Sequence, residues 1–283
     1  MLELLSEHGC CGGVQRFYRH ASSAIGLPMR FSVFLPPQAL ARPEQRLPAL
    51  FYLAGLTCTE ETFMIKAGAQ RFAAEHGLIL VAPDTSPRDT GIAGEAEAWD
   101  FGVGAGFYLD ATQAPWSQYW RMESYVTEEL FGLVTTALPA DPRRVGVFGH
   151  SMGGHGALVL AQRHPARFRS VSAFAPIAAP TRCPWGHKAL GRYLGDDRAT
   201  WEQYDASALM ARQAAAPFPR GILVDQGLAD KFLAEQLYPE ALEAACAAVG
   251  QPLTLRRHAS YDHGYYFIST FIEDHIRHHA AQL

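Results

Sequence analysis

Short apolar runs recur along the chain, and longer segments with helical spacing of apolar residues lie between them. An uninterrupted apolar run of this length is typical of a strand that is buried on both faces of a sheet. We therefore predict strands over Arg30–Leu35, Ala49–Leu53, Leu78–Ala82, Val145–Phe148, Ser170–Phe174, Gly221–Val224 and Leu253–Arg257.

The intervening segments have the length and periodicity of helices. Alternating strands and helices favour βαβ units, and hence an α/β fold with a mostly parallel sheet covered on both faces. The Pro-rich stretches 36–48 and 214–219 separate no self-sufficient halves, so we expect one domain over residues 1–283. The first two strands are candidates for an antiparallel pair at one edge. Helices are predicted over Glu60–His76, Ser117–Leu138, Met152–Arg163, Trp201–Ala211, Lys231–Val249 and Ile268–Ala280.

Sites in such sheets form where the strands end at their carboxyl side. The residues that follow the predicted strands are therefore the first candidates for chemistry. These segments are Gly55–Thr59, Pro83–Arg88, Gly149–Gly153, Gln226–Lys231 and His258–Gly264.

The segment Gly149-His-Ser-Met-Gly153 has the pattern G-x-S-x-G at a predicted strand-to-helix junction. A nucleophilic serine in this pattern sits on a tight turn that exposes its hydroxyl, and the glycines leave room for neighbouring backbone. The helix that begins there points its free N–H groups toward the same place. We predict Ser151 as a nucleophile; the alternative is a serine that only caps a Gly-rich helix.

A serine nucleophile needs a histidine base, and the histidine needs an acid that holds its tautomer. With this elbow the chain order is serine, acid, histidine, so both partners should follow Ser151. Asp225 and Asp230 compete for the acid. Asp225 continues its strand and could instead fix the next turn, so we favour Asp230, which lies in the loop.

The candidate base is His263, which lies in a loop before Gly264 and an apolar helix. His258 is nearer the strand end and is the weaker candidate. His275, His278 and His279 have a spacing that could suit a metal ion. We interpret them instead as cationic side chains at a helix C-terminus, and we predict no metal site.

Acyl transfer also needs two N–H donors for the oxyanion of the tetrahedral intermediate. One should be the backbone N–H of Met152, directly after the nucleophile. The other should come from the loop after an earlier strand, where Gly55 allows close approach of the backbone and the N–H of Leu56 is the candidate.

Composition narrows the possible partners. The 283 residues carry a net charge of −4, with 24 Lys and Arg against 28 Asp and Glu, so neither nucleic acid nor an anionic membrane surface is expected as a partner. The N-terminus lacks a secretory signal pattern and no apolar run is long enough to span a bilayer. Five cysteines with no CxxC spacing suggest neither a disulfide framework nor a zinc site, and favour a cytoplasmic location.

Long motifs extend beyond these single residues. They are Gly55–Glu60, Pro83–Arg88, Trp99–Tyr108, Tyr125–Leu130, Phe148–Leu158, Ser172–Ile177, Cys183–Gly186, Asp225–Gly227 and Tyr261–Phe267. Through these motifs the chain resembles the S-formylglutathione hydrolase family, also called esterase D, from about Cys10 to His279. The resemblance departs from the family at Gly264 and His187, where many relatives have Ser and Lys.

The resemblance implies an α/β-hydrolase fold and a triad of Ser151, Asp230 and His263. It implies hydrolysis of a glutathione thioester, S-formylglutathione, to glutathione and formate during formaldehyde removal. It further implies a homodimer and a mechanism without a cofactor.

Three further residues are candidates for substrate binding, namely Lys66, Lys188 and Trp185. Both lysines lie in segments that border the predicted site, where a cation would suit a substrate with two carboxylates; the alternative is a random surface lysine. Cys58 lies two residues beyond the Leu56 donor. We expect it to be a modulatory thiol through which bulky thiol reagents block the acyl pocket.

Three other functions remain open from the residues alone. A broad short-chain carboxylesterase would use the same triad, because the shape of the pocket sets the choice of acyl group. An acyltransferase would need an acceptor groove and exclusion of water. A catalytically silent binding protein would not need an intact nucleophile, acid and base.

Overall fold

Nine strands form one sheet in the order β1-β2-β3-β5-β4-β6-β7-β8-β9 in the computed structural model, which describes residues 2–283. Strands β4 to β9 run parallel, whereas β1, β2 and β3 form an antiparallel extension beside β5. The strands are β1 Leu2–Cys10, β2 Gly13–Ala21, β3 Pro28–Leu35, β4 Leu47–Leu53, β5 Ile79–Pro83, β6 Ala140–His150, β7 Ser170–Phe174, β8 Ile222–Gly227 and β9 Leu253–His258. The predicted α/β fold with a mostly parallel sheet is confirmed.

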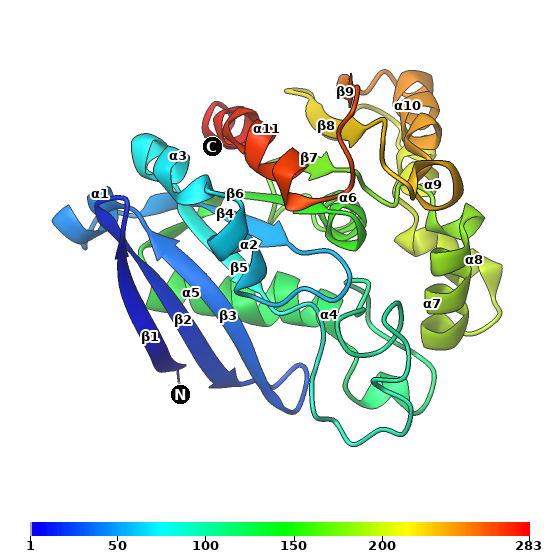
Figure 1. Cartoon of the computed structure of the whole chain (residues 1–283), viewed down its shortest axis with the longest axis horizontal. Coiled ribbons are helices and arrows are strands. Elements are labelled where there is room, and N and C mark those ends of the chain that lie inside the picture. The colour runs from blue at the N-terminus through cyan, green and yellow to red at the C-terminus, as the bar shows by residue number, and fades with distance from the viewer. Residues whose placement is uncertain (1) are drawn as a thin grey trace.

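Helices cover both faces of this sheet (Figure 1). Helices α3 and α11 pack against each other on one face, and α5 and α6 pack against β6 on the other. Within residues 2–283, no helix combines the length and the apolar character that crossing a lipid bilayer requires. The helices are α1 Pro37–Ala41, α2 Thr62–Lys66, α3 Ala69–His76, α4 Met122–Ser124, α5 Phe131–Ala137, α6 Met152–Arg163, α7 Pro184–Leu194, α8 Arg198–Trp201, α9 Ala206–Ala211, α10 Pro239–Ala248 and α11 Tyr265–Ala280.

Several predicted helices are interrupted where a residue cannot continue the helix. Gly68 has a φ of 68° and separates α2 from α3. Asp205 separates α8 from α9 because its carboxylate accepts hydrogen bonds from the first N–H groups of α9. The predicted range Ser117–Leu138 contains a π-helical turn at Tyr125–Leu130 between α4 and α5. Helices α1 and α7 were not predicted.

The N-terminal hairpin of β1 and β2 was also missed, because its inward-facing positions are polar. Gln15 and His20 point into the protein from β2, so the strand carries no simple alternation of apolar and polar residues. The tight turn at Cys11 and Gly12, both with positive φ, joins the two strands.

The expected antiparallel pair between the first two predicted strands is wrong. Strand β3 pairs with β2 and β5, whereas β4 lies between β5 and β6 and is parallel to both. Helix α1 connects β3 to β4 and carries the chain past β5, so the two predicted strands are not neighbours.

The histidines of α11 are buried polar residues, and interpreting them as cationic side chains was wrong. The hydroxyl of Ser172 on β7 lies 2.8 Å from His275 Nδ1 and 2.9 Å from His279 Nε2. Burial lowers the pKa of His275 and holds that of His279 well below its usual value, so both rings are neutral at pH 7. Among residues 2–283, these histidines belong to no group that could hold a metal ion.

Neutral buried histidines predict a loss of stability in mild acid. Burial lowers the pKa of His155 and of His278 to about 4, whereas an unfolded histidine titrates near 6.5. Below pH 6.5 the unfolded chain therefore binds protons that the folded chain rejects, and stability present above pH 6.5 is lost as the pH falls toward 4. Each of the two histidines should contribute a loss of about 2 kcal/mol between pH 7 and pH 5.

Thermal unfolding at a series of pH values measures this loss. The Tm should fall between pH 7 and pH 5, and it should fall less steeply in His278→Gln. Glutamine can still donate to the Val171 carbonyl, which His278 Nε2 contacts at 3.1 Å, but it does not titrate. A Tm that stayed constant over this pH range would contradict the argument.

Candidate active site

The junction of β6 and α6 places Ser151 on a strained turn. Strand β6 ends at His150 and α6 begins at Met152, and Ser151 between them has φ 57° and ψ −119°. A non-glycine residue in this region of backbone space costs about 1–3 kcal/mol and persists only where the surrounding structure holds it. The N–H of Ser151 donates to the Phe174 carbonyl of β7 at 3.0 Å, which helps to hold the turn.

Both glycines of the G-x-S-x-G pattern are required, because a side chain at either position would clash with the backbone. A Cβ atom at Gly153 would lie 1.9 Å from the carbonyl oxygen of Leu53, and one at Gly149 would lie 2.2 Å from the carbonyl oxygen of Gly153. Neither contact is possible, so only glycine lets α6 start this close to β4. Gly55 lies against Ser151 from the other side, where its Cβ would approach the Cβ of Ser151 to 3.2 Å.

Asp230 and His263 meet above the ends of β8 and β9. His263 Nδ1 lies 2.5 Å from Asp230 Oδ2, and the Asp230 side chain is fully buried. The other carboxylate oxygen of Asp230 accepts the Phe232 N–H at 2.8 Å, which fixes the carboxylate. His263 lines the same pocket as Ser151, so three segments far apart in the sequence meet at one edge of the sheet.

The competing candidates Asp225 and His258 are bound in a different cluster. Arg256 donates two hydrogen bonds to the Asp225 carboxylate, at 2.6 and 2.5 Å, and His258 Nε2 lies 3.2 Å away. Burial alone would raise the pKa of Asp225, but hydrogen bonds from His275 and Arg256 lower it. The cluster links β8, β9 and α11 beneath the loops that carry Asp230 and His263, so Asp225 neither forms a turn nor reaches His263.

His150 packs directly against the candidate base. The two imidazole rings are 4.4 Å apart between centroids. Burial, together with the charge of His263, holds the pKa of His150 well below its usual value. His150 therefore stays neutral and adds no charge beside His263. From the sequence we expect His150 to pack or form a hydrogen bond below the nucleophile, but the sequence does not indicate its contact with His263.

The two residues with the predicted oxyanion donors are near Ser151, because Leu56 lines the same pocket and Met152 is the next residue in the chain. Met152 is the first residue of α6, where N–H groups have no acceptor within the helix. Within residues 2–283, no acceptor is hydrogen-bonded to the N–H of Leu56, although the N–H of its neighbour Thr57 donates to the Gly104 carbonyl at 2.9 Å. Both N–H groups are therefore free to bind an oxyanion.

The loop that carries Leu56 is held in place by the segment after β5. The carbonyl of Cys58 accepts hydrogen bonds from the Thr85 hydroxyl at 2.6 Å and from Arg88 at 3.3 Å. Arg88 is itself fixed by two hydrogen bonds to Asp84. The motif Pro83–Arg88 thus supports the oxyanion loop, a role that the sequence pattern alone did not indicate.

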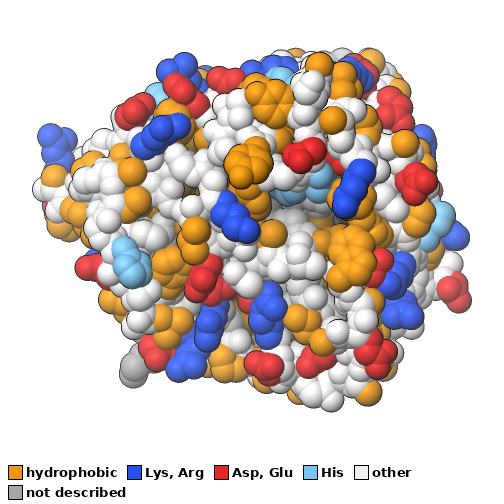
Figure 2. Space-filling view, viewed as in Figure 1, with side chains coloured by type: hydrophobic (Ala, Val, Ile, Leu, Met, Phe, Trp, Pro, Cys, Tyr) orange, Lys and Arg blue, Asp and Glu red, His pale blue; other side chains and the backbone are white. Residues whose placement is uncertain are grey.

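Figure 2 shows a hollow near the centre of one face, with histidine side chains at its floor and hydrophobic and basic side chains at its rim. A pocket of this composition, with a volume of about 270 Å³, lies over Ser151 and His263. Its wall is a continuous aromatic row in which Trp99 contacts Trp185, Trp185 contacts Phe232, and Phe232 contacts His263. Trp99, Phe232 and Tyr265 were not predicted as site residues.

The predicted substrate-binding residues fall into two groups. Lys66, Trp185 and Cys58 line the pocket, with Lys66 Nζ 5.7 Å from the centre of the Tyr265 ring. Burial raises the pKa of the Cys58 thiol, so it is protonated at pH 7. Lys188 does not line this pocket, and its ammonium group pairs with Asp100.

Known proteins similar to the chain agree on one family. The family model named Esterase matches residues 22–278. The S-formylglutathione hydrolases of Rattus norvegicus and Paracoccus denitrificans are each 50% identical, over 100% and 99% of this chain and 99% and 98% of their own length. The solved S-formylglutathione hydrolase of Agrobacterium tumefaciens has a TM-score of 0.95 and 47% identity, and the match covers 99% of both chains.

Proposed function

The chain belongs to the S-formylglutathione hydrolase family of α/β-hydrolase esterases, and we propose that it hydrolyses S-formylglutathione to glutathione and formate. The observation that carries the proposal is the convergence of a strained Ser151 with the His263–Asp230 pair in one pocket. This arrangement suits acyl transfer through a serine ester.

In the first half of the reaction, Ser151 Oγ attacks the thioester carbonyl carbon while His263 Nε2 takes the hydroxyl proton. Asp230 accepts the hydrogen bond of His263 Nδ1–H, which keeps Nε2 free as the base and stabilises the imidazolium. The carbonyl oxygen becomes negative and binds the N–H groups of Leu56 and Met152. The C–S bond then breaks, and glutathione leaves with the proton from His263.

In the second half, water attacks the formyl ester on Ser151. His263 Nε2 takes a proton from the water as the oxygen adds to the carbonyl carbon, and the same two N–H groups hold the new oxyanion. Collapse of this intermediate releases formate and returns the proton to Ser151 Oγ. The small pocket with its aromatic wall suits a small acyl group.

The products test the reaction type. Incubation with S-formylglutathione in the presence of glycerol should release one formate for each free thiol, measured by a formate dehydrogenase assay and a thiol reagent. Formation of a glycerol formyl ester in place of formate would assign the chain to the acyltransferases instead.

The main alternative is a short-chain carboxylesterase for which the glutathione thioester is a minor substrate. The same triad and oxyanion donors would serve it, and the aromatic pocket would accept a short acyl chain. The two functions differ in the relative turnover of the glutathione thioester and of a simple ester.

We expect Lys66 to bind one of the two carboxylates of the glutathione part. Lys66 lines the pocket, and among residues 2–283 no carboxylate pairs with it, whereas Lys188 is paired with Asp100. Lys66→Met should raise KM for S-formylglutathione roughly 10-fold, the value of one charged hydrogen bond, and leave p-nitrophenyl acetate hydrolysis unchanged. Lys188→Met is the matched control and should have little effect. Equal losses on both substrates would show that Lys66 has no role in carboxylate binding.

We place this activity in the cytoplasm, as a step in the removal of formaldehyde. All five cysteines are free thiols, including the exposed Cys11, which suits a reducing compartment. The expected homodimer is part of the same proposal. The outer edge strand β1, with Leu4 and Leu5 exposed, offers an apolar surface for a second copy.

A further inference from the structure

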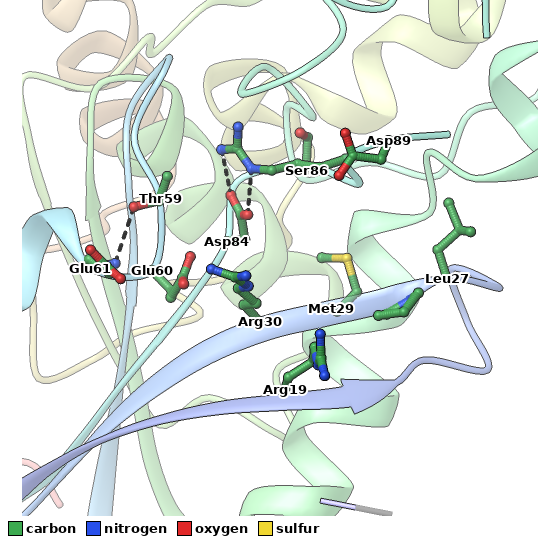
Figure 3. A pocket seen from close by; sticks show the side chains of 12 residues that line it. Arg19, Leu27, Met29, Arg30, Thr59, Glu60, Glu61, Asp84, Ser86 and Asp89 are labelled. Carbon is green, nitrogen blue, oxygen red and sulfur yellow. Dashed lines mark hydrogen bonds and ion pairs between the residues drawn. The ribbon is translucent and has the colours of Figure 1, made fainter. Parts of the chain in front are cut away.

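A second, larger pocket lies on the other side of the oxyanion loop. Its volume is about 550 Å³, and it is lined by β2, β3 and the loops after β4 and β5 (Figure 3). Charged side chains surround it, unlike the aromatic wall of the pocket over Ser151. The charged ones are Arg19, Arg30, Glu60, Glu61, Asp84, Arg88 and Asp89.

Three of these seven charges are already paired. Arg88 pairs with Asp84, and Arg19 pairs with Glu3. Within residues 2–283, the other four have no ion-pair partner, and of these only Glu60 is buried, whereas Arg30, Glu61 and Asp89 are exposed. In the same part of the chain, the Glu60 carboxylate has no hydrogen-bond donor except its own backbone N–H. Figure 3 shows the side chains of Glu60 and Arg30 close to each other in the pocket.

Burial of the Glu60 carboxylate should destabilise the folded protein. Glu60 is only 3% exposed, and burial beside Asp84 raises the pKa of its carboxyl to about 6. A buried carboxylate without a partner is destabilising unless a cation joins it. An ammonium group in the pocket would supply that cation. A carboxylate on the same ligand would meet the guanidinium of Arg30.

The two pockets share one short loop. Gly55, Leu56 and Cys58 line the pocket over Ser151, and Thr59, Glu60 and Glu61 line the charged pocket. The Cα atoms of Cys58 and Glu60 can be at most about 7 Å apart, because only Thr59 lies between them. The γ-glutamyl arm of glutathione measures about 10 Å from the thiol sulfur to the ammonium nitrogen when it is extended. This is about the length of three residues of extended polypeptide chain.

We propose that the charged pocket binds the α-amino acid group of the γ-glutamyl arm of the substrate, with its ammonium on Glu60 and its carboxylate on Arg30. The arm crosses the exposed residue Thr57 at the crest of the loop, while the thioester lies at Ser151. This arrangement leaves the glycine carboxylate for Lys66. The inference rests on the proposed function, and it explains how a formyl thioester of glutathione is chosen over a formyl thioester of a smaller thiol.

A truncated substrate tests the assignment. S-formyl-N-acetyl-cysteinylglycine lacks the amino acid group of the γ-glutamyl arm but keeps the thioester and the glycine carboxylate, and its acetylated nitrogen cannot take the formyl group from sulfur. Wild-type kcat/KM should be at least roughly 10-fold higher for S-formylglutathione than for this truncated substrate. Glu60→Gln and Arg30→Gln should each lower kcat/KM for S-formylglutathione roughly 10-fold, mainly through KM, and leave the truncated substrate unchanged.

Two controls separate binding from folding. Arg143→Gln changes an exposed arginine far along the chain, at the start of β6, and should alter neither substrate. Turnover of p-nitrophenyl acetate by Glu60→Gln and Arg30→Gln should equal that of the wild type, which shows that the elbow and the oxyanion loop are intact.

Other results would overturn the assignment in distinguishable ways. Equal losses on the full and truncated thioesters, or no loss on either, would show that the charged pocket does not bind the γ-glutamyl arm, while the proposed function would stand. Wild-type enzyme that turned over the ester but not S-formylglutathione would overturn the proposed function and this inference with it.

Discussion

Replacing Ser151 with alanine is expected to lower kcat for S-formylglutathione by roughly 10⁴- to 10⁶-fold. The variant loses the hydroxyl oxygen that we propose forms the acyl ester at the strained turn, and the N–H groups of Leu56 and Met152 cannot replace it. Stopped-flow or steady-state release of glutathione measures the loss. The same variant should lose p-nitrophenyl acetate activity and labelling by a fluorophosphonate.

Cys58→Ser is the matched control for this experiment. Cys58 lies in the same pocket and contributes the thiol of its lining, but burial raises the pKa of that thiol. Cys58→Ser should therefore keep most of the activity and lose sensitivity to bulky thiol reagents. If Ser151→Ala kept a tenth of the wild-type activity, or if Cys58→Ser lost all activity, the nucleophile would have to be a residue other than Ser151.

Replacing Asp230 with asparagine should lower kcat by roughly 10³- to 10⁴-fold. The amide of asparagine can donate to His263 Nδ1, which turns the imidazole to the tautomer whose Nε2 carries the proton and cannot act as a base. The change is nearly isosteric, and the Phe232 N–H keeps an oxygen acceptor, so the fold should remain. KM should change little, because Asp230 does not contact the substrate.

The companion variant Asp225→Asn should lose stability and keep its activity, the opposite of Asp230→Asn. Asp225 is buried, holds Arg256 and contacts two histidines. Its change weakens these hydrogen bonds and leaves the half-buried Arg256 with Asp274 as its charged partner, so the Tm should fall and the free energy of unfolding should drop by about 3 kcal/mol. The folded enzyme should retain most of its kcat. If Asp225→Asn abolished kcat while Asp230→Asn did not, the acid of the triad would be assigned wrongly.

The sequence predicted the parallel core well because burial on both faces leaves a strong signal. Strands such as β5 are continuous apolar runs, and α6 begins and ends where its glycine elbow and periodicity indicate. The β1–β2 hairpin could not be found in this way. Its inward positions include Gln15 and His20, which are satisfied by partners that only the folded chain provides, such as Val33 and Tyr125.

The meeting of Ser151, Asp230 and His263 was predictable because the chemistry of a catalytic triad would fix their order and their position after strands. Asp230 was favoured over Asp225 because a residue in the loop above the sheet can contact the histidine more easily than a residue within the strand. The distances that bear on this choice, 2.5 Å from Asp230 to His263 and 2.6 Å from Asp225 to Arg256, depend on the pairing of β8 with β9.

The arrangement of the pocket wall was beyond prediction for a different reason, although Trp185 was a candidate. Trp99, Trp185 and Phe232 are far apart in the sequence and come together only through long loops over the sheet. The charged pocket likewise combines β3 with two loops, and no local pattern links Arg30 to Glu60. The pairing of Lys188 with Asp100 was also not predictable, because nothing in the segment around Lys188 indicates it.

The most direct test of the account is kcat/KM for S-formylglutathione beside a short p-nitrophenyl ester, with wild type and Ser151→Ala assayed together. We expect a strong preference of the wild type for the thioester and loss of both activities in the variant. Equal or better turnover of the ester, still dependent on Ser151, would contradict the glutathione assignment and make the chain a general short-chain carboxylesterase.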